Sequence, residues 1–204
     1  MVSKPDNFTM RSTRWKPLIP FVIVVVCFVI QLAVDRGLQI NILGKREWTS
    51  LLDPFAHGSL AILVLSPLTF YFGVSRKVAL VALICAVAID VDHFIAAGSF
   101  SISSAISLPG RPMAHSILFC SGAALLIGAV SRSWSATLAV LLASLCHLSR
   151  DASGGGFTPL FWPSDYEWHI PRPLHLTIWT TWGLLGAALY AIKKRKEAVP
   201  YNCS

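Results

Sequence analysis

The sequence predicts an all-α integral membrane bundle of about six transmembrane helices. Hydrophobic residues make up 54% of the 204 residues and charged residues only 13%, whereas a soluble domain averages about 25% charged residues. The mean hydropathy is +0.62. The apolar residues also form segments near the length of about 20 residues that one membrane-spanning helix needs. We therefore expect a single membrane-embedded domain over residues 1–204, without a separate soluble domain.

The first apolar segment, 18–34, is too long for a typical signal-peptide core and lacks a following small-x-small cleavage site, so we interpret it as an uncleaved helix. The second begins with Asp53 and Pro54, which are favoured at a helix start. Short turns with basic residues separate the second segment from the third and the fourth from the fifth. The six expected spans are about 18–34, 54–73, 78–97, 112–130, 134–150 and 173–192.

The net charge of +7 raises the question of nucleic-acid binding. Eleven of the seventeen Lys and Arg residues, however, lie in the two termini and the short turns of one side of this topology. By the positive-inside rule, this asymmetry predicts that both termini are cytoplasmic. We find no long basic run with interleaved aromatic residues, so nucleic acid is not expected as a partner.

The stretch Asp90-Val91-Asp92-His93 lies at the end of the third apolar segment. Ionisable groups inside a bilayer are costly and usually functional. Carboxylate oxygen and imidazole nitrogen together suit a divalent cation, with zinc expected and manganese as the alternative. The stretch therefore predicts a metal site.

All six histidines fall on one side of the expected topology. His57 and His115 begin their segments, His93 and His147 end theirs, and His169 and His175 lie in or beside the last loop of that side. With both termini cytoplasmic, that side is extracytoplasmic. The segments thus predict a shared site at the lipid–water boundary of the extracytoplasmic side.

Helical spacing narrows the ligand set. Asp90 and His93 are three residues apart and His147 and Asp151 four apart, so each pair shares a helix face. Asp92 is turned by about 160° from Asp90 on a continuous helix, and it can be a ligand only if the helix ends before it; otherwise it would orient His115 or His57. The expected metal ligands are His57, Asp90, His93, His115, His147 and Asp151. This set suits two ions, or one ion with a catalytic carboxylate and spare imidazoles.

The second and fourth segments open alike, with Pro54-Phe55-Ala56-His57-Gly58 and Pro112-Met113-Ala114-His115-Ser116. His57 to His93 and His115 to Asp151 are both 36 residues. A repeat of two helical hairpins explains both observations, and chance is the alternative because Pro is common at helix starts.

These blocks resemble the YdjM-like inner-membrane proteins, a family described as membrane-bound, metal-dependent hydrolases. That family's pattern has an early His, Asp-x-Asp-His, His-Arg-Gly-x-Thr-His-Ser, and His-Leu-x-x-Asp followed by Gly and Pro. The corresponding residues here are His57, Asp90–His93, Arg111–Ser116, and His147–Asp151 with Gly156 and Pro159 or Pro163. The third block departs from the pattern: Gly110 replaces its first His, Pro112 its Gly and Ala114 its Thr. His169 or His175 could replace the missing His, or activity could be altered or lost.

The resemblance implies a hydrolase, and the residues make hydrolysis plausible. A divalent metal lowers the pKa of bound water to near 7, and clustered carboxylates can serve as general base. We assign catalytic roles to Asp92, Arg111 and Asp151. Arg111, or Arg150 as a second candidate, could clamp a phosphate; the alternative for both is snorkelling to lipid headgroups.

A phosphoester in a membrane lipid or lipid-linked molecule is the expected substrate, because the predicted site lies at the lipid–water boundary. Two other functions remain open at this point: a metal-ion transporter or sensor, and a scaffold that keeps a degenerate site. The aliphatic inner halves of the segments argue against a transport path.

Overall fold

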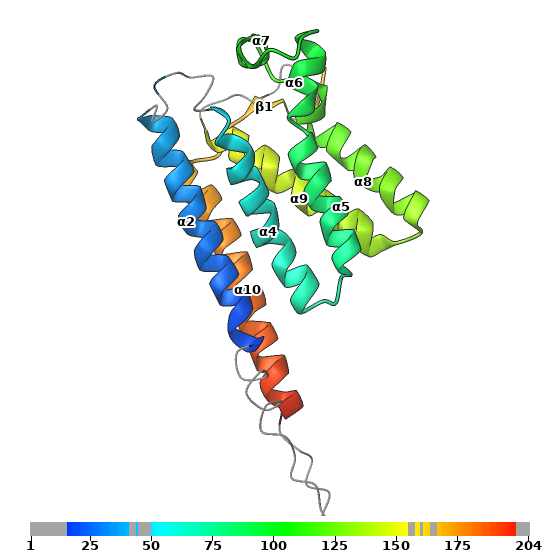
Figure 1. The fold of residues 1–204 in the computed structure, drawn as a ribbon. Coiled ribbons are helices and arrows are strands. Elements are labelled where there is room, and N and C mark those ends of the chain that lie inside the picture. Colours follow the sequence, from blue (N-terminus) through cyan, green and yellow to red (C-terminus); the bar gives the residue numbers. More distant parts are fainter. Residues whose placement is uncertain are drawn as a thin grey trace, which may run out of the picture.

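A computed structural model describes residues 16–40, 44, 50–154, 158–159, 161–163 and 167–198 of the chain. Residues 1–15, with three of the N-terminal basic residues, and Gly156 of the family-like pattern lie outside the described residues. Helices dominate the described part (Figure 1), which confirms the all-α prediction. The long helices are α2 (Ile19–Gln39), α4 (Asp53–Phe70), α5 (Arg76–Ala88), α8 (Ile117–Ser131), α9 (Trp134–Ser153) and α10 (Arg172–Ala198).

Helices α4 and α9 form the centre of the bundle. Helix α4 packs against α2 and α10 on one side, and α9 packs against α5 and α8 on the other. The two central helices also contact each other. Buried apolar side chains fill the space between them, among them Leu60, Val64, Val140 and Ala143. Burying these side chains together fixes the relative positions of the two helix ends that carry the polar residues described below.

Glycine allows two of the closest helix contacts. A Cβ atom at Gly186 of α10 would lie 2.3 Å from Cβ of Pro67 in α4. A Cβ atom at Gly128 of α8 would lie 1.7 Å from Oγ1 of Thr137 in α9. Small residues at such crossings are typical of helix packing in membranes.

Two helical segments of the described chain are long and apolar enough to cross a membrane, namely Lys16–Gln39 and Arg76–Ala96. The first includes the short 3₁₀ helix η1 (Lys16–Leu18). Helix α8 is apolar but shorter. Helices α4 and α9 carry ionisable side chains within one end, which lowers their mean hydropathy.

The structure differs from the expected spans at the polar end of the bundle. The third span, expected over 78–97, is broken into α5 and α6 (Val91–Ala96). The fourth begins with a separate 3₁₀ turn, η2 (Met113–His115), and α8 starts only at Ile117. The last helix continues to Ala198.

Short elements cover this end (Figure 1): α6, α7 (Ile102–Ile106) and the two-stranded antiparallel pair β1 (Thr158–Pro159) and β2 (Glu167–Trp168). The two strands lie in the aromatic loop between α9 and α10, where the sequence predicts no regular element.

Candidate metal centre

The break between α5 and α6 determines where the Asp-x-Asp-His side chains point. The N–H of Asp92 donates to the carbonyl of Ile89 at 3.2 Å, and the N–H of His93 donates to that of Asp90 at 3.3 Å. These bonds span three residues rather than four, so the α-helical spacing ends at this turn. The α-helix therefore ends before Asp92, so the Asp92 carboxylate is not turned away from that of Asp90. Both carboxylates face His115.

The 3₁₀ turn η2 brings His115 between these two carboxylates. Its Nδ1 lies 3.2 Å from Oδ1 of Asp92, and its Nε2 lies 3.3 Å from Oδ1 of Asp90. The Ala114 N–H donates to Oδ2 of Asp92 at 2.7 Å and fixes that carboxylate. With Nδ1 donating to Asp92, the lone pair of Nε2 points toward Asp90, the arrangement that carboxylates impose on metal-binding histidines.

The last turns of α9 supply the opposite side. His147 and Asp151, four residues apart, are both buried, and His147 Nε2 lies 3.3 Å from Asp151 Oδ2. His147 Nε2 also lies 3.5 Å from Asp90 Oδ1, and His115 Nε2 lies 3.4 Å from Asp151 Oδ2. Two imidazole nitrogens and two carboxylate oxygens therefore alternate at the corners of a quadrilateral, and each nitrogen contacts both oxygens. We call Asp90, His115, His147 and Asp151 the four-ligand cluster.

The distances in the four-ligand cluster fit a shared cation better than hydrogen bonds. All four N···O separations are 3.3–3.5 Å, longer than the usual N–H···O distance of about 2.9–3.0 Å. Two ligands of a tetrahedral zinc ion, with bonds of about 2.0–2.2 Å, lie about 3.3–3.5 Å apart. Among the described residues, His147 Nε2 and Asp151 Oδ2 are buried without a hydrogen-bond partner. The residues therefore fit a divalent metal.

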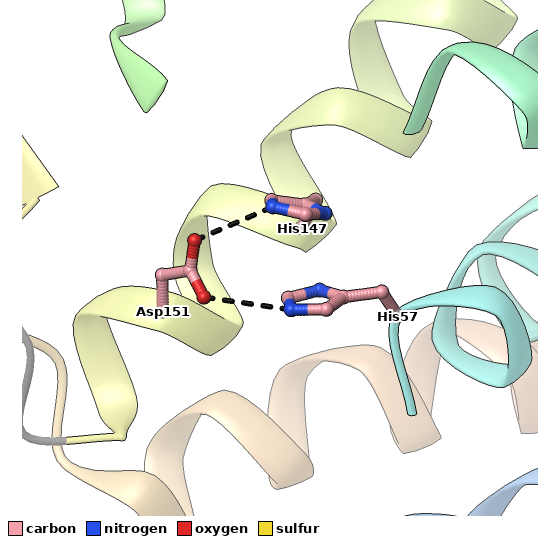
Figure 2. A group of neighbouring side chains, drawn as sticks. All are labelled: His57, His147 and Asp151. Carbon is pink, nitrogen blue, oxygen red and sulfur yellow. Dashed lines mark ion pairs between the residues drawn. The ribbon is translucent and has the colours of Figure 1, made fainter. Parts of the chain in front are cut away.

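His57, on the first turns of α4, lies next to this cluster. Its ring stacks on that of His147, with centroids 3.7 Å apart and planes inclined by 19°. Its Nε2 lies 3.5 Å from Oδ1 of Asp151. Figure 2 shows that the Asp151 carboxylate directs one oxygen to each of these two imidazoles.

His93 and Arg111 lie at the opposite edge of the cluster. The His93 ring is 4.7 Å from that of His115, and its Nε2 is 3.2 Å from Nη1 of Arg111. Nη2 of Arg111 lies 3.3 Å from Oδ1 of Asp151. The guanidinium therefore spans from His93 to Asp151.

The structure brings all of the sequence-derived site residues together: His57, Asp90, Asp92, His93, Arg111, His115, His147 and Asp151. Three overlapping groups of these could hold a metal ion: His57, His147 and Asp151; Asp90, His115 and His147; and Asp92, His93 and His115.

The remaining two histidines do not join them. His175 is buried beside Ser149, whose hydroxyl lies 3.1 Å from its Nδ1, and Ser149 also accepts from Trp179 Nε1 at 2.8 Å. His169 is exposed. These positions do not support a replacement, by either histidine, of the family's histidine that is Gly110 in this chain.

Sequence reasoning missed a second polar cluster beside the first. Arg150 donates to Asp35 at 2.9 Å and to Asp53 at 2.6 Å, and Nε of Arg172 donates to Asp35 at 2.9 Å. We call these four residues the Arg150 network; they tie α2, α4, α9 and α10 together. The signal in the sequence was Asp35, a carboxylate at the end of the long apolar run of α2.

A cavity of about 310 Å³ adjoins both clusters. Its size lies at the lower end of the range of small-molecule sites. Three guanidinium groups and three carboxylates line it, together with a few neutral residues: Asp35, Leu38, Gln39, Asp53, Arg111, Arg150, Asp151, Gly154 and Arg172. Arg111 and Asp151 connect it to the four-ligand cluster.

Comparison with known proteins gives one match. Residues 52–202 match the YdjM inner membrane protein family, which covers the whole candidate centre. No curated protein and no solved structure matches the chain.

Proposed function

Because the chain belongs to the YdjM inner membrane protein family and carries the four-ligand cluster, we propose that it is a metal-dependent hydrolase of the bacterial inner membrane. The proposed substrate is a phosphoester in a lipid or a lipid-linked molecule. The observation that carries the proposal is the set of four N···O separations of 3.3–3.5 Å among three buried side chains and the partly buried Asp90. Zinc is the proposed metal, because two imidazoles and two carboxylates suit its tetrahedral preference.

When bound, a divalent cation would act as a Lewis acid and activate a water molecule for attack on phosphorus. The chain's own residues prepare this chemistry. Nδ1 of His115 is hydrogen-bonded to Oδ2 of Asp92, and with Nδ1 as the donor the lone pair of Nε2 is left for a metal. The sequence predicts a catalytic role for Asp92, whereas its contacts with His115 favour a role as a positioning residue.

Asp151 and Arg111 keep the catalytic roles that the sequence suggested. Asp151 lines the cavity, where its carboxylate can accept a proton from water as long as Oδ1 holds no cation. Arg111 is 24% exposed and lines the cavity. Its guanidinium can bind a phosphate oxygen there and stabilise the negative charge that would develop on that oxygen in the transition state.

We propose six membrane spans with both termini in the cytoplasm. Apart from the break at Asp90, the described helices α2, α4, α5–α6, α8, α9 and α10 correspond to the six apolar segments of the sequence. The charge asymmetry of the loops supports this orientation. The cluster would then face the extracytoplasmic side, where lipid headgroups are within reach.

A metal-ion transporter or sensor remains the alternative, since buried ionisable groups also mark ion pathways. The described helices place a tightly packed apolar core between the cluster and the opposite end of the bundle. That packing favours an enzyme over a transport path. Flux of zinc into liposomes that contain the purified protein would favour the transporter.

The test uses protein purified in detergent without chelator. We expect bound zinc or manganese and hydrolysis of short-chain phosphatidic acid or of a generic phosphomonoester. Asp90→Asn and His147→Ala should lose both metal and activity, and His169→Ala is the matched control because this histidine is exposed and outside the cluster. Metal-free wild-type protein, or full activity in His147→Ala, would contradict the proposal. A protein that binds metal but hydrolyses neither probe would favour the degenerate scaffold.

A further inference from the structure

We propose that a second divalent cation binds between Asp53, His57 and Asp151, so that Asp151 bridges two metal ions. This inference rests on the proposed function, because Asp151 is also a member of the four-ligand cluster. It adds Asp53, which the sequence suggested only as a helix-starting residue.

The two oxygens of Asp53 have different surroundings. Oδ1 accepts from Arg150 at 2.6 Å. Oδ2 lies 3.5 Å from Nε2 of His57, one helical turn further along α4. Arg150 thus fixes the carboxylate by one oxygen and leaves the other directed at the imidazole, as outer partners of metal-binding carboxylates do.

His57 is buried, with 1% of its surface exposed. Neither of its ring nitrogens has a hydrogen-bond partner among the described residues. Its Nε2 is equally far, 3.5 Å, from Oδ2 of Asp53 and from Oδ1 of Asp151. A buried nitrogen held between two carboxylate oxygens, beyond hydrogen-bonding distance of both, fits the spacing of ligands around one cation.

Asp151 provides the link between the two sites. Its Oδ2 faces His115 and His147, and its Oδ1 faces His57 (Figure 2). A carboxylate that divides its oxygens in this way can bridge two ions at the separation of about 3.5–4 Å that is common in phosphoester-cleaving enzymes.

Arg111 also contacts Oδ1 of Asp151, at 3.3 Å. A carboxylate oxygen has two lone pairs and can therefore accept one N–H group and bind one cation. Asp53, Arg111 and Asp151 all line the cavity. The second cation would have three protein ligands and open positions toward this cavity, as catalytic rather than structural sites have.

The opposite edge of the cluster is less suitable for a second ion, although Asp92, His93 and His115 are close enough to bind one. Oδ2 of Asp92 already accepts the Ala114 N–H at 2.7 Å. Nε2 of His93 lies 3.2 Å from the Arg111 guanidinium, whose positive charge would repel a cation. At the proposed second site the guanidinium groups contact the carboxylates of Asp151 and Asp53 instead of the imidazole, and the ring nitrogens of His57 have no hydrogen-bond partner among the described residues.

The experiment counts zinc or manganese per chain in purified protein titrated with each metal and then desalted. We expect two equivalents in the wild type and one in Asp53→Asn, whose side-chain oxygen can still accept from Arg150. Asp35→Asn is the matched control, because it alters the Arg150 network from the other side without touching the second site. It should keep two equivalents.

A second readout tests the bridge itself. In the manganese-loaded wild type, electron paramagnetic resonance should show two coupled ions, and Asp53→Asn should show one isolated ion. One equivalent in the wild type would overturn the second site and leave the proposed function standing, whereas no bound metal would remove both. Two equivalents in Asp53→Asn would also overturn it. If Asp53→Asn does not fold, His57→Gln takes its place with the same expected loss of one equivalent.

Discussion

The four-ligand cluster and the Arg150 network lie side by side in one protein, yet their charges are arranged differently. In the Arg150 network, guanidinium groups donate to carboxylates at 2.6–2.9 Å. In the four-ligand cluster, imidazoles and carboxylates stand 3.3–3.5 Å apart, and several buried atoms have no hydrogen bond within the part of the chain that the structure describes. The Arg150 network pairs its charges at hydrogen-bonding distance, although Nε of Arg150 has no partner among the described residues, whereas the four-ligand cluster has the spacing of ligands around a cation.

Asp53 belongs to both regions. One of its oxygens completes an ion pair of the Arg150 network, and the other faces His57 beside the four-ligand cluster. Substitutions in the two regions should therefore have different effects. Removal of a residue of the Arg150 network should lower the stability of the fold, and removal of a residue of the four-ligand cluster should first lower metal binding and activity.

The largest expected effect is that of Asp90→Asn or His147→Ala on hydrolysis. Loss of a cation that supplies several kcal/mol of transition-state stabilisation corresponds to at least about 10³-fold in rate. We expect this loss in kcat/KM together with loss of bound metal, measured on the same preparation. A variant that loses metal but retains the rate would show that the cation is not catalytic.

Arg150→Met should give the largest loss of stability. It leaves the buried carboxylate of Asp35, and that of Asp53, without their shared partner, which typically costs about 3–5 kcal/mol. Arg172→Gln is the matched comparison, because Arg172 is 29% exposed, so water can partly replace it, and Asp35 keeps its bond to Arg150; we expect a smaller loss than for Arg150→Met. Thermal unfolding in detergent measures both variants. Equal losses would contradict the distinction between a buried and a partly exposed arginine.

Metal removal should lower stability through the four-ligand cluster and the adjacent second site. A cation at 100 times its Kd stabilises the folded state by about 2.7 kcal/mol, so chelation should lower the Tm by several degrees. His147→Ala should abolish this chelator effect, whereas Arg172→Gln should retain it. A wild-type Tm that is the same with and without chelator would argue against a resident metal.

Asp92→Asn should have the smallest of these effects. Loss of a carboxylate that orients a metal-binding histidine typically weakens metal affinity by about 10–100-fold. Excess zinc should therefore restore most of its activity, which it cannot do for Asp90→Asn. Failure of excess zinc to rescue Asp92→Asn would indicate that Asp92 acts directly in the reaction.

The sequence allowed the all-α fold to be predicted, because apolar segments of this length can only be helical in a bilayer. It also allowed convergence of His57, His115 and His147 to be predicted, since each lies at a helix end on the same side of the topology. The directions of the side chains were harder to predict. Asp92 faces His115 only because the helix breaks at Asp90, and no Pro or Gly marks that break.

The Arg150 network could not be read from sequence spacing, because its members come from four different helices. Asp35 and Arg150 are 115 residues apart, and only the packing of α2 beside α4 and α10 brings them together. The same packing separates His175 from the cluster, although its position in the sequence placed it on the correct side of the topology.

The central claim is that the four-ligand cluster holds a divalent cation, and anomalous X-ray diffraction at the zinc edge tests it most directly. Crystals of the protein purified with zinc should show an anomalous peak between Asp90, His115, His147 and Asp151. Absence of that peak in zinc-containing crystals, with these imidazoles hydrogen-bonded to the carboxylates instead, would contradict the account.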